Sequence, residues 1–136
     1  MPWKSWSTTA STPMKLEFCE TPSFSRDLKK LTKRFRTLPE DLENVKKFAN
    51  ELYHLRNVDN QSIFQLQEFQ TGAVQIYKLK KFACRALKGK GVQSGLRMIY
   101  AYHQHLGRVE FIELYYKGDQ ENEDRERIRA YIHKLD

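Results

Sequence analysis

The chain has 136 residues and a net charge of +7, with 40% hydrophobic and 12% aromatic residues. This length suits one domain with a single modest core, and the apolar content excludes global disorder. No apolar run approaches the ~20 residues that a membrane-spanning helix needs, and the first dozen residues lack the apolar stretch of a secretory signal. We therefore expect a cytoplasmic protein with a flexible tail over residues 1–13 and one domain over residues 14–136.

Neither a metal site nor a cofactor is predicted. The two cysteines, Cys19 and Cys84, have no metal-ligand spacing, and we expect reduced thiols rather than a disulfide. His, Cys, Asp and Glu form no cluster at metal-ligand spacing. The glycines at residues 89–91 fit a flexible loop and not a phosphate-binding motif.

The N-terminal half predicts a strand followed by a helical hairpin. Alternating residues suit a short strand over residues 14–20. Apolar residues at i, i+4, i+7 and i+11 predict an amphipathic helix over residues 24–35, whose opposite face is basic. A second helix begins near Thr37, which has capping-box spacing to Glu40, and runs to about Leu55. The short link between the helices predicts an antiparallel pair.

The C-terminal half predicts three strands and a helix. Residues 57–72 are polar and poorly periodic, which is typical of a loop. A two-residue turn at Leu106 and Gly107 would join the last two strands into a hairpin. Acids followed by bases then suit a helix from about residue 119 to the C-terminus. The strands are expected over residues 74–83, 96–103 and 109–117.

The predicted fold class is α+β. We expect a small antiparallel (mixed) twisted sheet, with the N-terminal helical hairpin and the C-terminal helix packed on one face.

Positive charge is segregated along the chain. No acidic residue occurs over residues 69–109, whereas residues 110–136 hold eight acids and five bases. Cations without interspersed carboxylates attract polyanions such as nucleic acid; the alternative is a solvated basic face without a ligand. The cations of this acid-free window are Lys78, Lys80, Lys81, Arg85, Lys88, Lys90, Arg97 and Arg108.

Two motifs in this window carry a family resemblance: Tyr-Lys-Leu-Lys at residues 77–80 and Ser-Gly-Leu-Arg-Met-Ile-Tyr at residues 94–100. Together with the order of the elements, they make residues 14–134 resemble the RelE/ParE superfamily of toxins, in particular its RelE-like members. The resemblance implies a ribosome-dependent endoribonuclease that cuts messenger RNA and is neutralised by a cognate antitoxin. It also implies that Lys78, Lys80 and Arg97 surround the scissile phosphate.

Two departures from the family pattern keep other functions open. The basic loop over residues 85–93 is longer, and residues 119–124 lack the tyrosine that several RelE-like members place after the last strand. One alternative is a ParE-like toxin that inhibits DNA gyrase. Another is a non-catalytic relative that binds nucleic acid or an antitoxin.

The residues themselves suggest roles in metal-independent RNA cleavage, which needs a base, cations and an acid around the phosphate. Arg97 is the strongest candidate because its guanidinium matches two phosphate oxygens. Lys78 and Lys80 share a strand face about 7 Å apart. Lys80 is the preferred base, because neighbouring cations lower the pKa of a lysine.

The predicted turn makes Arg97 face Tyr116, close to Lys117. Tyr116 is then a candidate proton donor, although an ordinary sheet aromatic is the commoner role. RNA contacts are expected from Lys81, Arg85, Lys88 and Lys90.

The histidines are expected to be structural. His103, for example, lies six strand residues or roughly 20 Å from Arg97. As partners we expect the ribosome with its messenger RNA, and an acidic antitoxin segment that covers the basic sheet, but no membrane.

Overall fold

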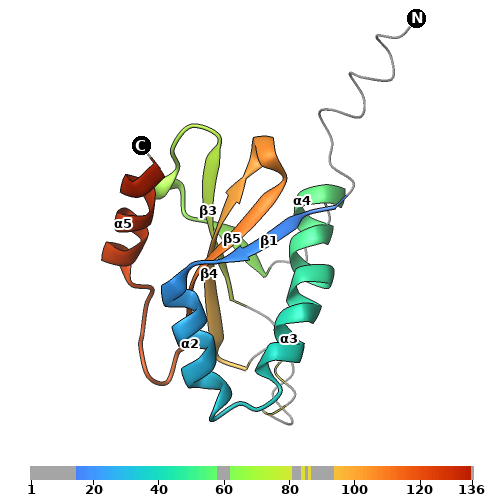
Figure 1. The fold of residues 1–136 in the computed structure, drawn as a ribbon, viewed down its shortest axis with the longest axis vertical. Helices are drawn as coiled ribbons and strands as arrows, with labels where there is room; N and C mark the ends of the chain where they lie inside the picture. The colour runs from blue at the N-terminus through green and yellow to red at the C-terminus, as the bar shows by residue number, and fades with distance from the viewer. Residues whose placement is uncertain (1–14, 58–61, 81–83, 85, 87–93, 136) are drawn as a thin grey trace, which may run out of the picture.

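The chain folds into a five-stranded sheet with helices on both of its faces (Figure 1). The computed structural model describes residues 15–57, 62–80, 84, 86 and 94–135, without the side chains of residues 48, 49 and 52. Among the helices of this described part, none is both long and apolar enough to cross a membrane. In chain order the elements are β1 (Glu17–Glu20), α2 (Pro22–Thr32), α3 (Leu38–Val45), the π-helix η1 (Lys46–Glu51), α4 (Leu52–Arg56), β2 (Ile63–Gln65), the 3-10 helix η2 (Gln67–Phe69), β3 (Val74–Leu79), β4 (Leu96–His103), the 3-10 helix η3 (Gln104–Leu106), β5 (Arg108–Tyr116) and α5 (Arg125–Leu135).

The sheet has the strand order β1-β5-β4-β3-β2. β1 pairs with β5 in parallel, and the other neighbours are antiparallel. The sheet is therefore mixed, and the predicted α+β class is confirmed.

Each face of the sheet buries its own core, because side chains alternate along a strand. In β3, Tyr77 and Leu79 belong to the larger core under α2 and α3. Their neighbour Ile76 belongs to a second core with Ile128 of α5. We call the first side the hairpin face and the second the α5 face. The prediction that all helices share one face is wrong, since the strands are apolar on both sides and α5 covers the second one.

The start of α2 is tied to the sheet through Thr21. Its hydroxyl accepts a hydrogen bond from the Phe24 N–H at 3.2 Å and donates one to the Phe111 carbonyl at 3.0 Å. Loss of an N-cap oxygen costs about 1 kcal/mol. We expect Thr21→Ala to lower the free energy of unfolding by about 1–2 kcal/mol in urea titration. Ser25→Ala removes only an exposed bond to Glu20 and is the control, with a change within about 0.5 kcal/mol.

Three local predictions are corrected. Residues 57–72 are not simply a loop, because they contain β2 and η2. The predicted second helix holds its position as α3, η1 and α4, but the Thr37 side chain does not cap it and donates instead to Asp41. The turn before β5 is a 3-10 helix closed by Gly107 at φ 61°, not a two-residue turn.

Candidate nucleic-acid interface

The register of the sheet brings three predicted cations to the α5 face. Lys78 pairs with Ile99, and Arg97 lies two residues before Ile99 on the same strand. Lys80 follows β3 directly, and its carbonyl accepts a hydrogen bond from Arg97 Nη1 at 3.0 Å. The prediction that Lys78 and Arg97 share a face is therefore confirmed.

Of the three predicted cations on the α5 face, Arg97 and Lys80 have no acidic partner among the described residues. Arg97 is partly exposed; Nη1 bonds only to backbone carbonyls, and among the described residues no carboxylate pairs with it. Lys80 is exposed, and its Nζ lies 5.0 Å from the ring centroid of Phe64. Arg97 and Lys80 are thus neighbouring residues in the sheet without acidic partners among the described residues, and such a pair of cations is suited to binding a phosphate.

Lys78, by contrast, is occupied by an acid of the chain. Its Nζ bonds to Glu123 Oε1 at 2.7 Å, and the two side chains are only 11% and 9% exposed. Burial is the largest single influence and lowers the pKa of Lys78, but the interactions with Glu123 and Tyr115 together outweigh it, and the pKa is raised. The expectation that neighbouring cations lower the pKa is thus wrong for Lys78, because a carboxylate is its nearest charge.

The tyrosine opposite Arg97 is Tyr115 and not Tyr116. A β-bulge between Ile99 and Tyr100 shifts the register by one residue and so turns Tyr116 to the hairpin face. There Tyr116 packs against Phe35, with ring centroids 5.2 Å apart. The predicted pairing of Arg97 with Tyr116 is wrong, and Tyr116 loses its position as proton donor.

Tyr115 itself is buried, and its hydroxyl makes no hydrogen bond to the described residues. Burial raises the pKa of Tyr115, while Lys78 acts in the opposite direction. The phenol therefore stays protonated at neutral pH beside Arg97.

The remaining predicted cations lie at the border of the site, at the other end of the sheet or outside the described residues. Lys117 is exposed directly after β5, and its N–H donates to the Gly95 carbonyl at 2.8 Å, so it borders the start of β4. Arg108, at the other end of β5, forms an ion pair with Glu17 at 2.5 Å. Four predicted RNA contacts lie outside the described residues: Lys81, Arg85, Lys88 and Lys90.

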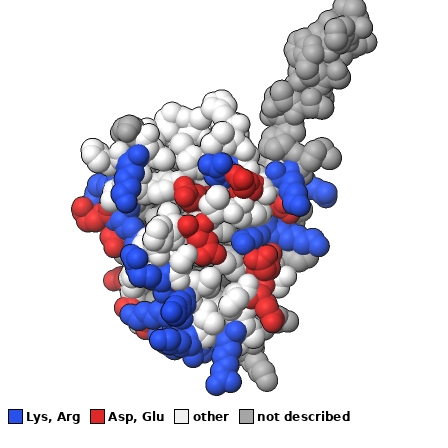
Figure 2. Space-filling view, in the orientation of Figure 1, with Lys and Arg blue, Asp and Glu red and all other residues white. Residues whose placement is uncertain are grey.

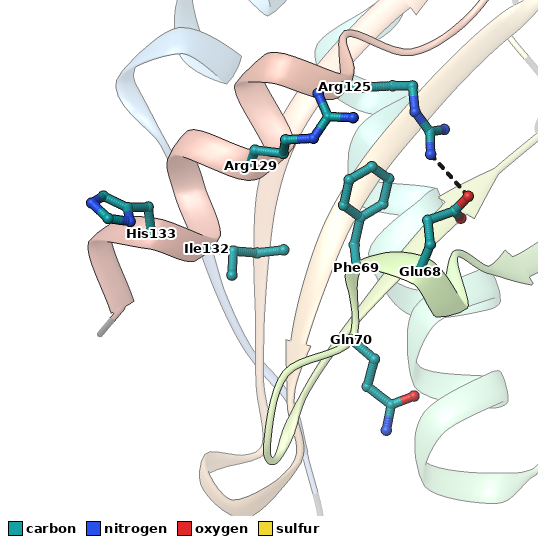
Figure 3. Close-up of a pocket in the computed structure, with 7 residues that line it drawn as sticks. All are labelled: Glu68, Phe69, Gln70, Arg125, Arg129, Ile132 and His133. Atoms are coloured by element: carbon teal, nitrogen blue, oxygen red, sulfur yellow. Dashed lines mark hydrogen bonds and ion pairs between the residues drawn. The ribbon is translucent and has the colours of Figure 1, made fainter.

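A pocket of about 460 Å³ lies between η2 and α5 (Figure 3). Phe69 of η2 lies under the guanidinium of Arg125, 4.6 Å from the ring centroid, and Arg129 approaches the same ring to 5.9 Å. Arg125 also bonds to Glu68 at 2.8 Å and to Glu123 at 3.2 Å. α5 and the residues before it thus form a network that holds Glu123 against Lys78.

Two of the histidines make internal contacts. His54 bonds to Tyr100 at 2.7 Å, and burial lowers its pKa to about 4. His103 bonds to Tyr131 at 2.7 Å. Across the described ranges, His, Cys, Asp and Glu form no group that could hold a metal ion.

Sequence reasoning gave too little weight to a second basic surface. Figure 2 shows basic side chains gathered low in the view, over α2. The charge pattern of the predicted helix already carried this signal, and its position on the hairpin face separates it from Arg97. The exposed cations of α2 are Arg26, Lys29 and Lys30, followed directly by Lys33.

No protein-family model matches the sequence, and no curated protein matches it. Among solved structures, the chain is similar to the crystal structure of an archaeal RelE–RelB complex from Pyrococcus horikoshii OT3. The sequence identity is 14%, the TM-score is 0.48, and the match covers 77% of this chain and 98% of that chain. Neither the family nor the function of the chain rests on this likeness.

Proposed function

We propose that the chain is a RelE-like toxin of a type II toxin–antitoxin system, which binds messenger RNA on the ribosome and cleaves it without a metal. Its partners are then the ribosome, the messenger RNA and a cognate antitoxin, and its compartment is the cytoplasm. One observation carries the proposal: Arg97 donates a hydrogen bond to the backbone carbonyl of Lys80, and neither side chain has an acidic partner among the described residues. The family resemblance of residues 77–80 and 94–100 supplies the reaction.

In this reaction the 2′-hydroxyl attacks the adjacent phosphorus, the bond from phosphorus to the 5′-oxygen breaks, and the 5′-oxygen takes a proton from water. Arg97 binds the non-bridging oxygens, whose negative charge grows in the transition state. Lys80 is the candidate base for the 2′-hydroxyl proton; this role requires the neutral amine, whereas the ammonium form of Lys80 binds the phosphate. Lys78 adds to the positive potential at the phosphate only to the extent that Glu123 does not neutralise its charge.

A second candidate function is a relative that binds RNA or an antitoxin without cleaving it. The ion pair between Lys78 and Glu123 favours this candidate, because a cation held by a buried carboxylate contributes little to catalysis. A ParE-like gyrase inhibitor has less need of the clustered cations.

One experiment separates these functions. The protein is induced in cells, messenger RNA ends are mapped, and DNA supercoiling by gyrase is assayed in parallel with the purified protein. New messenger ends in the presence of translation, with supercoiling unchanged, are the expected result. Inhibited supercoiling without new ends would identify a gyrase inhibitor, and neither effect from a folded protein would identify the non-catalytic relative.

A further inference from the structure

Phe64 is an exposed aromatic side chain on the edge strand of the sheet. Its side chain is 42% exposed, which makes it one of three large exposed apolar residues in the described part of the chain. Its neighbour Ile63 is buried in the core of the hairpin face. By strand alternation Phe64 therefore points to the α5 face.

The ring of Phe64 borders the phosphate site. Phe64 is the cross-strand partner of Lys78, and such partners have Cβ atoms roughly 5 Å apart. Lys80 Nζ lies 5.0 Å from its ring centroid. The backbone carbonyl of Lys80 accepts a hydrogen bond from the Arg97 guanidinium. The ring of Phe64, the ammonium of Lys80 and the guanidinium of Arg97 thus come from three neighbouring strands, β2, β3 and β4, at the same end of the sheet.

This sequence of groups suits single-stranded RNA. Proteins that bind single strands place aromatic rings, on which bases stack, beside cations that hold the phosphates. A base in a duplex is already stacked on both sides and offers no face to a protein ring. The two other exposed apolar residues, Leu106 and Leu135, have neither an aromatic ring nor this arrangement of cations.

We propose that Phe64 is the stacking platform for an unpaired base next to the phosphate that Arg97 and Lys80 hold. This inference rests on the proposed RNA-binding function and names its substrate class as unpaired RNA. On binding, the Lys80 ammonium moves from the ring of Phe64 to the phosphate, and the unpaired nucleobase takes its place on the ring. β2 is only three residues long, which offers little backbone for pairing with a strand of a protein partner.

The test compares binding of two probes, a twelve-residue oligoadenylate and its duplex with oligouridylate, at several salt concentrations. Phe64→Leu keeps an apolar side chain but removes the ring, and it is expected to weaken binding of the single strand about tenfold. The salt slope should not change, because stacking releases no counterions. Phe64→Trp should retain wild-type affinity, and the duplex should not distinguish the variants.

Leu106→Ala is the matched control, because Leu106 is 60% exposed and lies at the far end of β4. Equal affinity of Phe64→Leu and wild type for the single strand, or an equal loss for strand and duplex, would overturn the stacking role. If Phe64→Leu then weakens binding of a protein partner, the ring belongs to a protein interface. A wild-type protein that binds neither probe overturns the stacking proposal, whereas the nuclease, which acts on the ribosome, is judged by the messenger ends. Binding that depends on Phe64 without cleavage overturns only the nuclease.

Discussion

Arg97→Ala is expected to lower messenger cleavage on ribosomes by about 100- to 1,000-fold, the usual loss when one donor to a transition-state oxyanion is removed. The guanidinium is partly exposed, and its Nη1 bonds only to backbone carbonyls, so the change should leave the fold intact. The measurement is single-turnover cleavage of a ribosome-bound message.

Arg108→Ala serves as the matched control, because Arg108 is also in the acid-free window but pairs with Glu17 at the other end of the sheet. Its cleavage rate should stay within about twofold of wild type. Arg97→Lys keeps the charge but loses the planar fork, and we expect an intermediate rate. Wild-type cleavage by Arg97→Ala would remove Arg97 from the mechanism.

Breaking the buried ion pair should have the largest effect on stability. Glu123→Ala leaves the Lys78 ammonium, 11% exposed, without a carboxylate, and we expect the free energy of unfolding to fall by about 3 kcal/mol. Lys78→Met should cost less, since Glu123 keeps Arg125 at 3.2 Å. Urea unfolding checks both values. Glu126→Ala is the control, because the pair of Glu126 with Arg129 is exposed and contributes little.

The same pair predicts a dependence on pH. Burial is the largest single influence and raises the pKa of Glu123, but Lys78, Arg125 and a backbone hydrogen bond together lower it more, so that the net shift is downward. A carboxylate whose pKa is lowered in the folded state stabilises the protein above its unfolded value, near 4.5. That stabilisation is lost as the pH falls from there through the folded value. A Glu123→Gln variant should lose this part of the acid sensitivity; an unchanged acid profile would contradict the assignment.

Much of the fold could be predicted because its signals are local. The apolar stripe of α2 and the alternation of β4 and β5 identify these elements directly. These elements needed no knowledge of distant contacts. The shared face of Lys78 and Arg97 also depends on the register between β3 and β4, because a slip of one residue would put the two side chains on opposite faces.

The errors arose where backbone irregularity or long-range contact decides. The error in the turn shifted the predicted register between β4 and β5 by two residues, which leaves each side chain on its predicted face. The bulge between Ile99 and Tyr100 shifted the register by one residue and so turned Tyr116 to the opposite face from Arg97. β2 was missed because three residues carry no periodic pattern. The partner of Lys78 was missed because Glu123 lies 45 residues away, on the segment that leads into α5.

The most direct test of the central claim is to map amide chemical shifts of the full chain while oligoadenylate is added. We predict that the largest changes lie on the α5 face, at Arg97, Lys80 and Phe64. Changes confined to the basic surface of α2, at Lys29, Lys30 and their neighbours, would contradict the claim and place the RNA on the hairpin side of the molecule.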